Sequence, residues 1–155
     1  MKILCHLIFS ILAIQNLNAQ SQISGRYVEI PSQKNSFYGS KLILNCNHTF
    51  FRNDSAYQKD SAILCYGTWK ILKDSQLILH IDSVLAWGNT DFPNVNLKLK
   101  FVNGQIFNQS VSKKDYNNLV QGRNKKRGYN VESFEAFKER ELSRFFAVVN
   151  YFKCE

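Results

Sequence analysis

The stretch VNLKLKFVNGQIFNQSV, residues 95–111, decides the fold class of this chain. In its first seven residues Val, Leu, Leu and Phe occupy every second position, with Asn or Lys between them. A two-residue period places the apolar side chains on one face of a half-buried β-strand. Asn103 and Gly104 then favour a two-residue hairpin turn, because a type I′ turn needs positive φ at both central positions. The stretch therefore predicts two antiparallel strands joined by a tight turn.

Similar strand patterns recur along most of the chain. They lie near residues 25–30, 41–45, 49–54, 62–72, 76–83, 95–102 and 105–111. Successive hairpins form a meander, and a meander of seven or eight strands closes into a barrel or folds into a sandwich, since an open sheet leaves exposed edges. The chain has 155 residues, among them 12 Phe, 7 Tyr and 2 Trp. This is enough apolar surface for one core, so we expect a single domain.

The pattern changes after residue 112. Residues 113–130 are polar and basic and predict a long loop. Ser133 suits the N-cap of a helix near residues 133–145 that has Glu135 in its first turn. The apolar residues that share one stripe of such a helix, if it continues that far, are Val131, Phe134, Leu142, Phe145 and Val149. Residues 145–152 are rich in Phe, Val and Tyr. Instead of continuing the helix, they could form a last strand that closes the sheet.

Several short motifs resemble small exported bacterial lipocalin-like proteins. The motifs, within residues 25–83, are Gly25-Arg26-Tyr27, Leu42-Ile43-Leu44, Asn47-His48-Thr49-Phe50, Gly67-Thr68-Trp69-Lys70 and Leu77-Ile78-Leu79. The resemblance implies an antiparallel barrel or half-barrel with an apolar interior and no catalytic residues. The sequence departs from true lipocalins at Tyr27, where they prefer Trp. The expected fold is all-β, an antiparallel meander closing into a lipocalin-like barrel or half-barrel with one C-terminal helix.

Strand alternation also nominates residues that form the core or line a cavity. They are Leu42, Leu44, Phe50, Trp69, Leu77 and Leu79. Small barrels occur both filled by side chains and hollow around a ligand, so the alternation leaves both forms open.

The N-terminal residues 1–19 have the features of a secretory signal peptide. Lys2 supplies a positive start, residues 3–14 form an apolar run that is too short to span a membrane as a helix, and Ala19 offers a small residue at the cleavage site. Cleavage there leaves a domain of residues 20–155, secreted or periplasmic, without a transmembrane segment; the alternative is that the segment stays uncleaved as an anchor.

In an exported protein the cysteines are expected to form disulfides, because an oxidising compartment favours these bonds. Beyond the signal peptide the chain has Cys46, Cys65 and Cys154. Cys46–Cys65 is the first expected pair if the loop before the strand at 62–72 centres near Tyr57; a centre near Lys59 moves the two apart. Pairing of either residue with Cys154 is the alternative.

The sequence predicts no enzyme, no metal site and no cofactor. Beyond the signal peptide only His48 and His80 could act as a histidine base, and neither a Gly-x-Ser-x-Gly turn nor a His-Glu-x-x-His helix occurs. Cys46, His48, Cys65 and His80 do not have the spacing of a compact zinc motif.

The charge balance suggests a different role. The chain has 20 Lys and Arg against 12 Asp and Glu, a net charge of +8. The expected anion-docking residues are Lys113, Lys114, Arg123, Lys125, Lys126 and Arg127. Such a segment either binds anionic surfaces or keeps a loop solvated. We therefore expect a binding or structural module that holds a small apolar ligand, or alternatively a surface-interaction protein that docks an anionic polymer or a partner protein through residues 113–127.

Overall fold

The computed structural model describes residues 23–30, 40–54, 63–86, 88–121 and 133–154. The first half of this part contains β1 (Gly25–Ile30), β2 (Lys41–Leu44), β3 (Thr49–Asp54), β4 (Ile63–Ile71), the 3-10 turn η1 (Lys73–Ser75) and β5 (Gln76–Ala86). The second half contains β6 (Asn89–Asp91), β7 (Val95–Val102), β8 (Gln105–Ser110), α2 (Lys113–Tyr116), the π-helical turn η2 (Asn117–Gln121), α4 (Phe134–Ser143) and β9 (Phe145–Tyr151). The predicted signal peptide, residues 1–19, lies outside the described residues.

Eight of the strands close into an antiparallel barrel. The sheet runs β4-β3-β2-β1-β9-β8-β7-β5-β6, and an additional pairing of β4 with β5 closes it, while β6 is a short extension paired with β5. Around the barrel each strand therefore neighbours the next one in sequence, and β9 returns to pair with β1. The all-β meander is confirmed, in its closed form. Closure matters because it removes the exposed edges of an open sheet.

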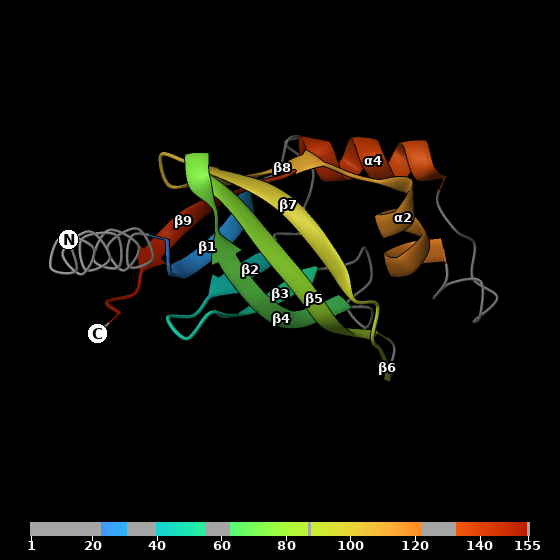
Figure 1. Cartoon of the computed structure of the whole chain (residues 1–155), viewed down its shortest axis with the longest axis horizontal. Coiled ribbons are helices and arrows are strands. Elements are labelled where there is room, and N and C mark those ends of the chain that lie inside the picture. Colours follow the sequence, from blue (N-terminus) through green and yellow to red (C-terminus); the bar gives the residue numbers. More distant parts are fainter. Residues whose placement is uncertain (1–22, 31–39, 55–62, 87, 122–132, 155) are drawn as a thin grey trace, which may run out of the picture.

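The barrel has two different ends. At one end, hereafter the helix end, α2 and α4 lie beside the strands, as Figure 1 shows on its right side. At the other, hereafter the tail end, lie the turns at residues 45–48, 73–75 and 103–104 and the C-terminal residues 152–154.

The barrel interior is packed with aliphatic and aromatic side chains. All six of the predicted core residues are buried, and Leu42, Leu44, Leu77 and Leu79 have no exposed surface at all. A side chain that lined a water-sized hollow would present surface to it, so these four lie in a filled part of the barrel. Each such buried leucine contributes roughly 1.5–3 kcal/mol to folding.

Two glycines allow backbone arrangements that a side chain would hinder: Gly104 in a tight turn and Gly67 where two strands approach closely. Asn103 and Gly104 have φ of 49° and 78°, which confirms the predicted hairpin turn between β7 and β8. At Gly67 a Cβ atom would lie 1.9 Å from the carbonyl oxygen of His80. The absence of a side chain therefore allows β4 to approach β5 at this irregular point of their pairing.

The C-terminal region differs from the long loop that the sequence predicts for residues 113–130. Residues 113–116 form α2 and not a loop, because Ser112 and Asp115 make a capping box. Tyr116 of this helix packs against Phe137 of α4.

Helix α4 begins after the predicted cap, with Ser133 Oγ accepting a hydrogen bond from the N–H of Ala136. It ends at Ser143, and residues 145–151 form β9, which confirms the alternative of a closing strand. The expected helical stripe is therefore wrong; the residues that α4 buries are Phe137 and Glu141.

Candidate functional site

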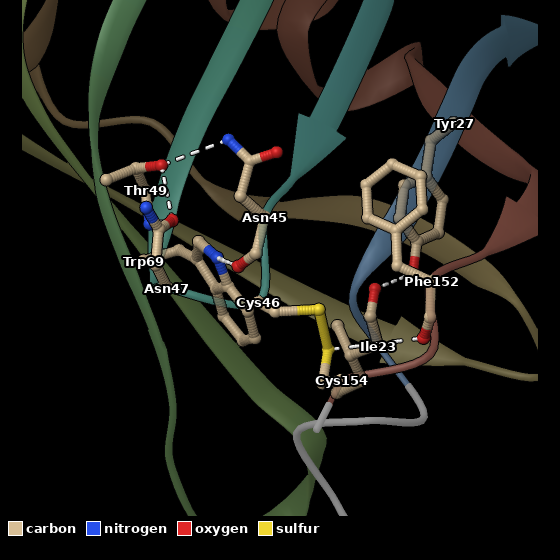
Figure 2. The surroundings of a disulfide bond; sticks show 9 residues. All are labelled: Ile23, Tyr27, Asn45, Cys46, Asn47, Thr49, Trp69, Phe152 and Cys154. Atoms are coloured by element: carbon tan, nitrogen blue, oxygen red, sulfur yellow. Dashed lines mark hydrogen bonds between the residues drawn. A yellow bond between two sulfur atoms is a disulfide. The ribbon is translucent and has the colours of Figure 1, made fainter.

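A disulfide between Cys46 and Cys154 ties the C-terminal tail to the turn after β2 (Figure 2). The Cys46–Cys65 pairing expected first is wrong, and the alternative partner Cys154 is confirmed. Cys65 lies opposite Arg52 in the β3–β4 ladder and is buried in the core. Arg52 pairs with Leu42 in the β2–β3 ladder, and Cys46 follows Leu42 by four residues, so Cys65 and Cys46 are separated by roughly 13 Å, too far for a disulfide.

Further contacts fix the tail end of the barrel. The N–H of Phe152 donates to the carbonyl oxygen of Ser24 at 2.8 Å, and Trp69 Nε1 donates to the carbonyl oxygen of Asn45 at 2.9 Å. The hydroxyl of Tyr27 donates to the carbonyl oxygen of Ile23. Burial of Tyr27, together with the nearby Tyr151 hydroxyl, raises the pKa of Tyr27 well above its ordinary value, so the hydroxyl stays protonated as a donor.

An open groove of about 880 Å³ lies beside this disulfide. Phe101, Tyr151 and Phe152 supply its apolar surface, while Asn103 and Lys153 are polar and exposed. Gly104 and Cys154 complete the lining. Apart from Cys154, the alternative disulfide partner, none of these residues was predicted from the sequence as a site residue, because the groove forms where a hairpin turn and the tail meet.

The helix end carries a buried ion cluster, which we define as Glu29, Arg52, Asp54, Glu141 and Arg144. Arg52 donates to Asp54 at 2.9 Å and to Glu141 at 3.2 Å. Arg144 donates to Glu141 at 3.0 Å, to Asp54 at 2.7 Å and to Glu29 at 2.8 Å. The cluster therefore joins β1, β3 and α4.

The electrostatics of the ion cluster keep the carboxylates of Asp54 and Glu141 ionised. Burial alone would raise the pKa of Asp54 and of Glu141, but the charges of Arg52 and Arg144 outweigh burial and hold both pKa values below their ordinary range. Since every charged group of the cluster has an oppositely charged partner, the cluster anchors α4 to the barrel and offers no unpaired charge to a ligand.

Sequence reasoning did not find the ion cluster, whose members are spread from β1 to the end of α4. One signal was present. Arg52 is two residues from the predicted core residue Phe50, and alternation therefore places this arginine on the inner face of β3.

A basic surface covers the outer face of β4, β5 and β7; we call Lys70, Lys98, Lys100 and Ile78 the lysine wall. Lys70 pairs with Ile78, and Ile78 pairs with Lys98, so two lysines flank one isoleucine at a backbone separation of about 10 Å. Lys100 follows two residues further along β7, on the same face. Ile78 is buried although it points outward, which fits its position between two long lysine stems.

The lysine wall is electrostatically uncompensated within the described part of the chain. All three lysines are exposed and have no ion-pair partner there. The strands β4, β5 and β7 contain one acidic residue, Asp82, whose carboxylate lies 3.0 Å from Nε2 of His80.

A shallow hollow of about 230 Å³ adjoins the lysine wall. Its lining comprises Thr68, Trp69, Lys70, Ile78, His80 and Asn96. Asn96 Oδ1 lies 2.9 Å from Nδ1 of His80, and Gln76 donates to Gln109 at 3.0 Å nearby on β5 and β8. The lysine wall is thus bordered by side chains that form hydrogen bonds.

The predicted anion-docking segment is described only in part. Lys113 and Lys114 are exposed in α2, and α2 contacts β7, the strand of Lys98 and Lys100. The other four candidates, Arg123, Lys125, Lys126 and Arg127, lie outside the described residues.

Across the described ranges, no group of three or more His, Cys, Asp or Glu side chains is arranged to hold a metal ion. None of the helices in that same part of the chain has the length and hydrophobicity that crossing a membrane requires. No family model, curated protein or solved structure matches the chain. The geometry of the molecule is therefore the basis of its proposed function.

Proposed function

We propose that this protein is an exported binding module that docks an acidic polysaccharide through its lysine wall. The observation that carries the proposal is the register Lys70–Ile78–Lys98 with Lys100 beside it. It places three exposed ammonium groups on β4 and β7, the two strands that flank β5, without acidic partners in the described structure. Uncompensated charge of one sign attracts polyanions and raises their rate of association.

Export is supported by the disulfide and by the predicted signal peptide. Disulfides form and persist mainly in oxidising compartments such as the periplasm or the extracellular space. Cys46 and Cys154 are bonded in this structure, and residues 1–19 have the composition of a secretory signal.

The side chains around the lysine wall favour a polysaccharide over other classes of polyanion. Gln76, Asn96 and Gln109 present amide groups, which can hydrogen-bond to sugar hydroxyls. Binding of single-stranded nucleic acid typically uses exposed aromatic platforms for base stacking. Ile78 lies between Lys70 and Lys98, and Phe107, the partner of Lys100 on β8, is half-buried and stacks on Phe145. Nucleic acid is therefore an outcome for the test to distinguish.

The expectation of an apolar ligand held inside the barrel has less support. The leucines around the middle of the barrel are fully buried among other side chains, which leaves no hollow against them. Binding at the lysine wall does not require a cavity inside the barrel.

The test measures binding of polygalacturonate, a carboxylate polysaccharide, at two salt concentrations. The Lys70→Gln/Lys98→Gln variant should weaken binding about thirtyfold at low salt, since each of the two lysines contributes roughly 1 kcal/mol near an anionic surface. Arg26→Gln/Lys41→Gln is the matched control, because it removes the same charge from exposed positions on β1 and β2.

Equal losses in the two double variants would mean that only net charge matters and would refute the lysine wall as a site. Tighter binding of oligothymidylate than of polygalacturonate, lost in the same variant, would instead assign the surface to nucleic acid.

A further inference from the structure

We infer that the groove at the tail end is a second binding site, which takes a small amphiphile with an apolar body and an anionic head. It is distinct from the lysine wall, because its lining comes from the end of β7, the Asn103–Gly104 turn and the C-terminal tail. The inference does not depend on the polysaccharide proposal.

The lining has the chemistry of an amphiphile site. Phe101, Tyr151 and Phe152 form the apolar part, and Tyr151 keeps 46% of its surface exposed. Covering this surface with a hydrocarbon chain removes it from water, which is the main favourable contribution to such binding. At about 880 Å³ the groove is within the size range of small-molecule sites.

The charge of the lining selects the head group. Lys153 is exposed at the groove, and the other lining residues that the structure describes carry no charge. An ammonium group that has no carboxylate beside it among the described lining residues attracts a carboxylate or a phosphate and repels a cationic head.

The groove is built before any ligand arrives. The disulfide fixes Cys154, and hydrogen bonds from Phe152 to Ser24 and from Val148 to Gly104 hold the segments on either side. A Cβ atom at Gly104 would lie 3.1 Å from the Tyr151 hydroxyl, so the glycine leaves room for that ring. A preformed site avoids the entropic cost of ordering its walls on binding.

The test compares three probes with the same hydrocarbon chain by isothermal titration calorimetry, below their micelle concentrations. The probes are dodecanoate, dodecanol and dodecyltrimethylammonium. We expect dodecanoate to bind most tightly, dodecanol more weakly and the cationic probe least.

Two variants assign the contacts. Lys153→Gln should weaken dodecanoate about fivefold to tenfold and leave dodecanol unchanged, because it removes only the charge of an exposed side chain. Tyr151→Ser should weaken both probes. Lys70→Gln/Lys98→Gln should change neither, which separates this site from the lysine wall.

Three results would overturn the inference. They are the absence of dodecanoate binding, equal affinity for all three probes, and an unchanged preference for dodecanoate in Lys153→Gln. The last result can be interpreted even if Tyr151→Ser does not fold, because Lys153 takes no part in the described packing.

Discussion

Arg52 and Arg144 both donate to one oxygen atom, Oδ1 of Asp54, at 2.9 and 2.7 Å. Their guanidinium carbons also lie at the same distance, 5.6 Å, from the centre of the Phe146 ring. Two cations this close are stable in a buried site only because Asp54, Glu141 and Glu29 surround them. The position of α4 on the barrel therefore depends on a charge balance as well as on apolar contact.

Replacing Glu141 by Gln should lower the free energy of unfolding by about 3 kcal/mol, since it leaves two buried guanidinium groups short of one negative charge. Urea unfolding followed by circular dichroism measures the change. Glu139→Gln is the control on the same helix; Glu139 is exposed and should change stability by less than about 0.5 kcal/mol. Equal effects of the two substitutions would contradict the anchoring role of the ion cluster.

The ion cluster should also make the fold sensitive to acid. Asp54 and Glu141 have pKa values that are lower in the folded protein than in the unfolded chain, so the folded state binds fewer protons there. Their contribution is complete above the unfolded pKa values of about 4 and is lost as pH falls below them.

We therefore expect the free energy of unfolding to decrease from about pH 5 towards pH 2, with a shallower slope in Glu141→Gln. Urea titrations at a series of pH values test this. A wild-type slope that the variant retains in full would assign the acid sensitivity to other carboxylates.

Reducing the Cys46–Cys154 disulfide should destabilise the protein by about 2–5 kcal/mol, because it links residues 108 positions apart. The measurement compares urea midpoints with and without reductant. Cys65→Ala should respond to reductant as the wild type does, whereas Cys154→Ser should no longer respond. Loss of the response in Cys65→Ala would contradict the observed pairing.

Gly67→Ala should destabilise the protein by about 3 kcal/mol or more, or prevent folding. Its Cβ would meet the His80 carbonyl at 1.9 Å, and backbone atoms can relieve such a clash only by separating β4 from β5. Gly88→Ala is the comparison: it has open space around it but φ of 74°, so only conformational strain of about 1–2 kcal/mol is expected. Thermal unfolding of the two variants distinguishes steric conflict from strain.

The strands could be predicted from sequence because their signal is local. Alternation placed the inner residues of the 95–102 strand correctly, and Asn103–Gly104 specified its turn. Strand β6 was not predicted, since three residues are too short to show a period. Helix α2 was missed for a similar reason, because one capping box within a basic segment determines it.

The candidate sites depend on information that no local pattern contains. The disulfide could be assigned only with the β3–β4 register, which places Cys65 opposite Arg52. Cys46 is therefore too far from Cys65 and pairs with Cys154 of the tail. The lysine wall required the register of three strands, since nothing in the sequence alone shows that Lys70 and Lys98 flank Ile78. The basic segment at 113–127 could be predicted from the sequence because its six Lys and Arg residues lie within one short stretch that has Asp115 as its one acidic residue.

Strand β9 has a consequence for biosynthesis. It pairs with both β8 and β1, so residues 145–151 provide the last wall of the barrel. A nascent chain that lacks these residues cannot complete the structure, however many earlier hairpins it has formed. The barrel can therefore close only after residues 145–151 have been synthesised, so its early hairpins must persist without their final partner until then.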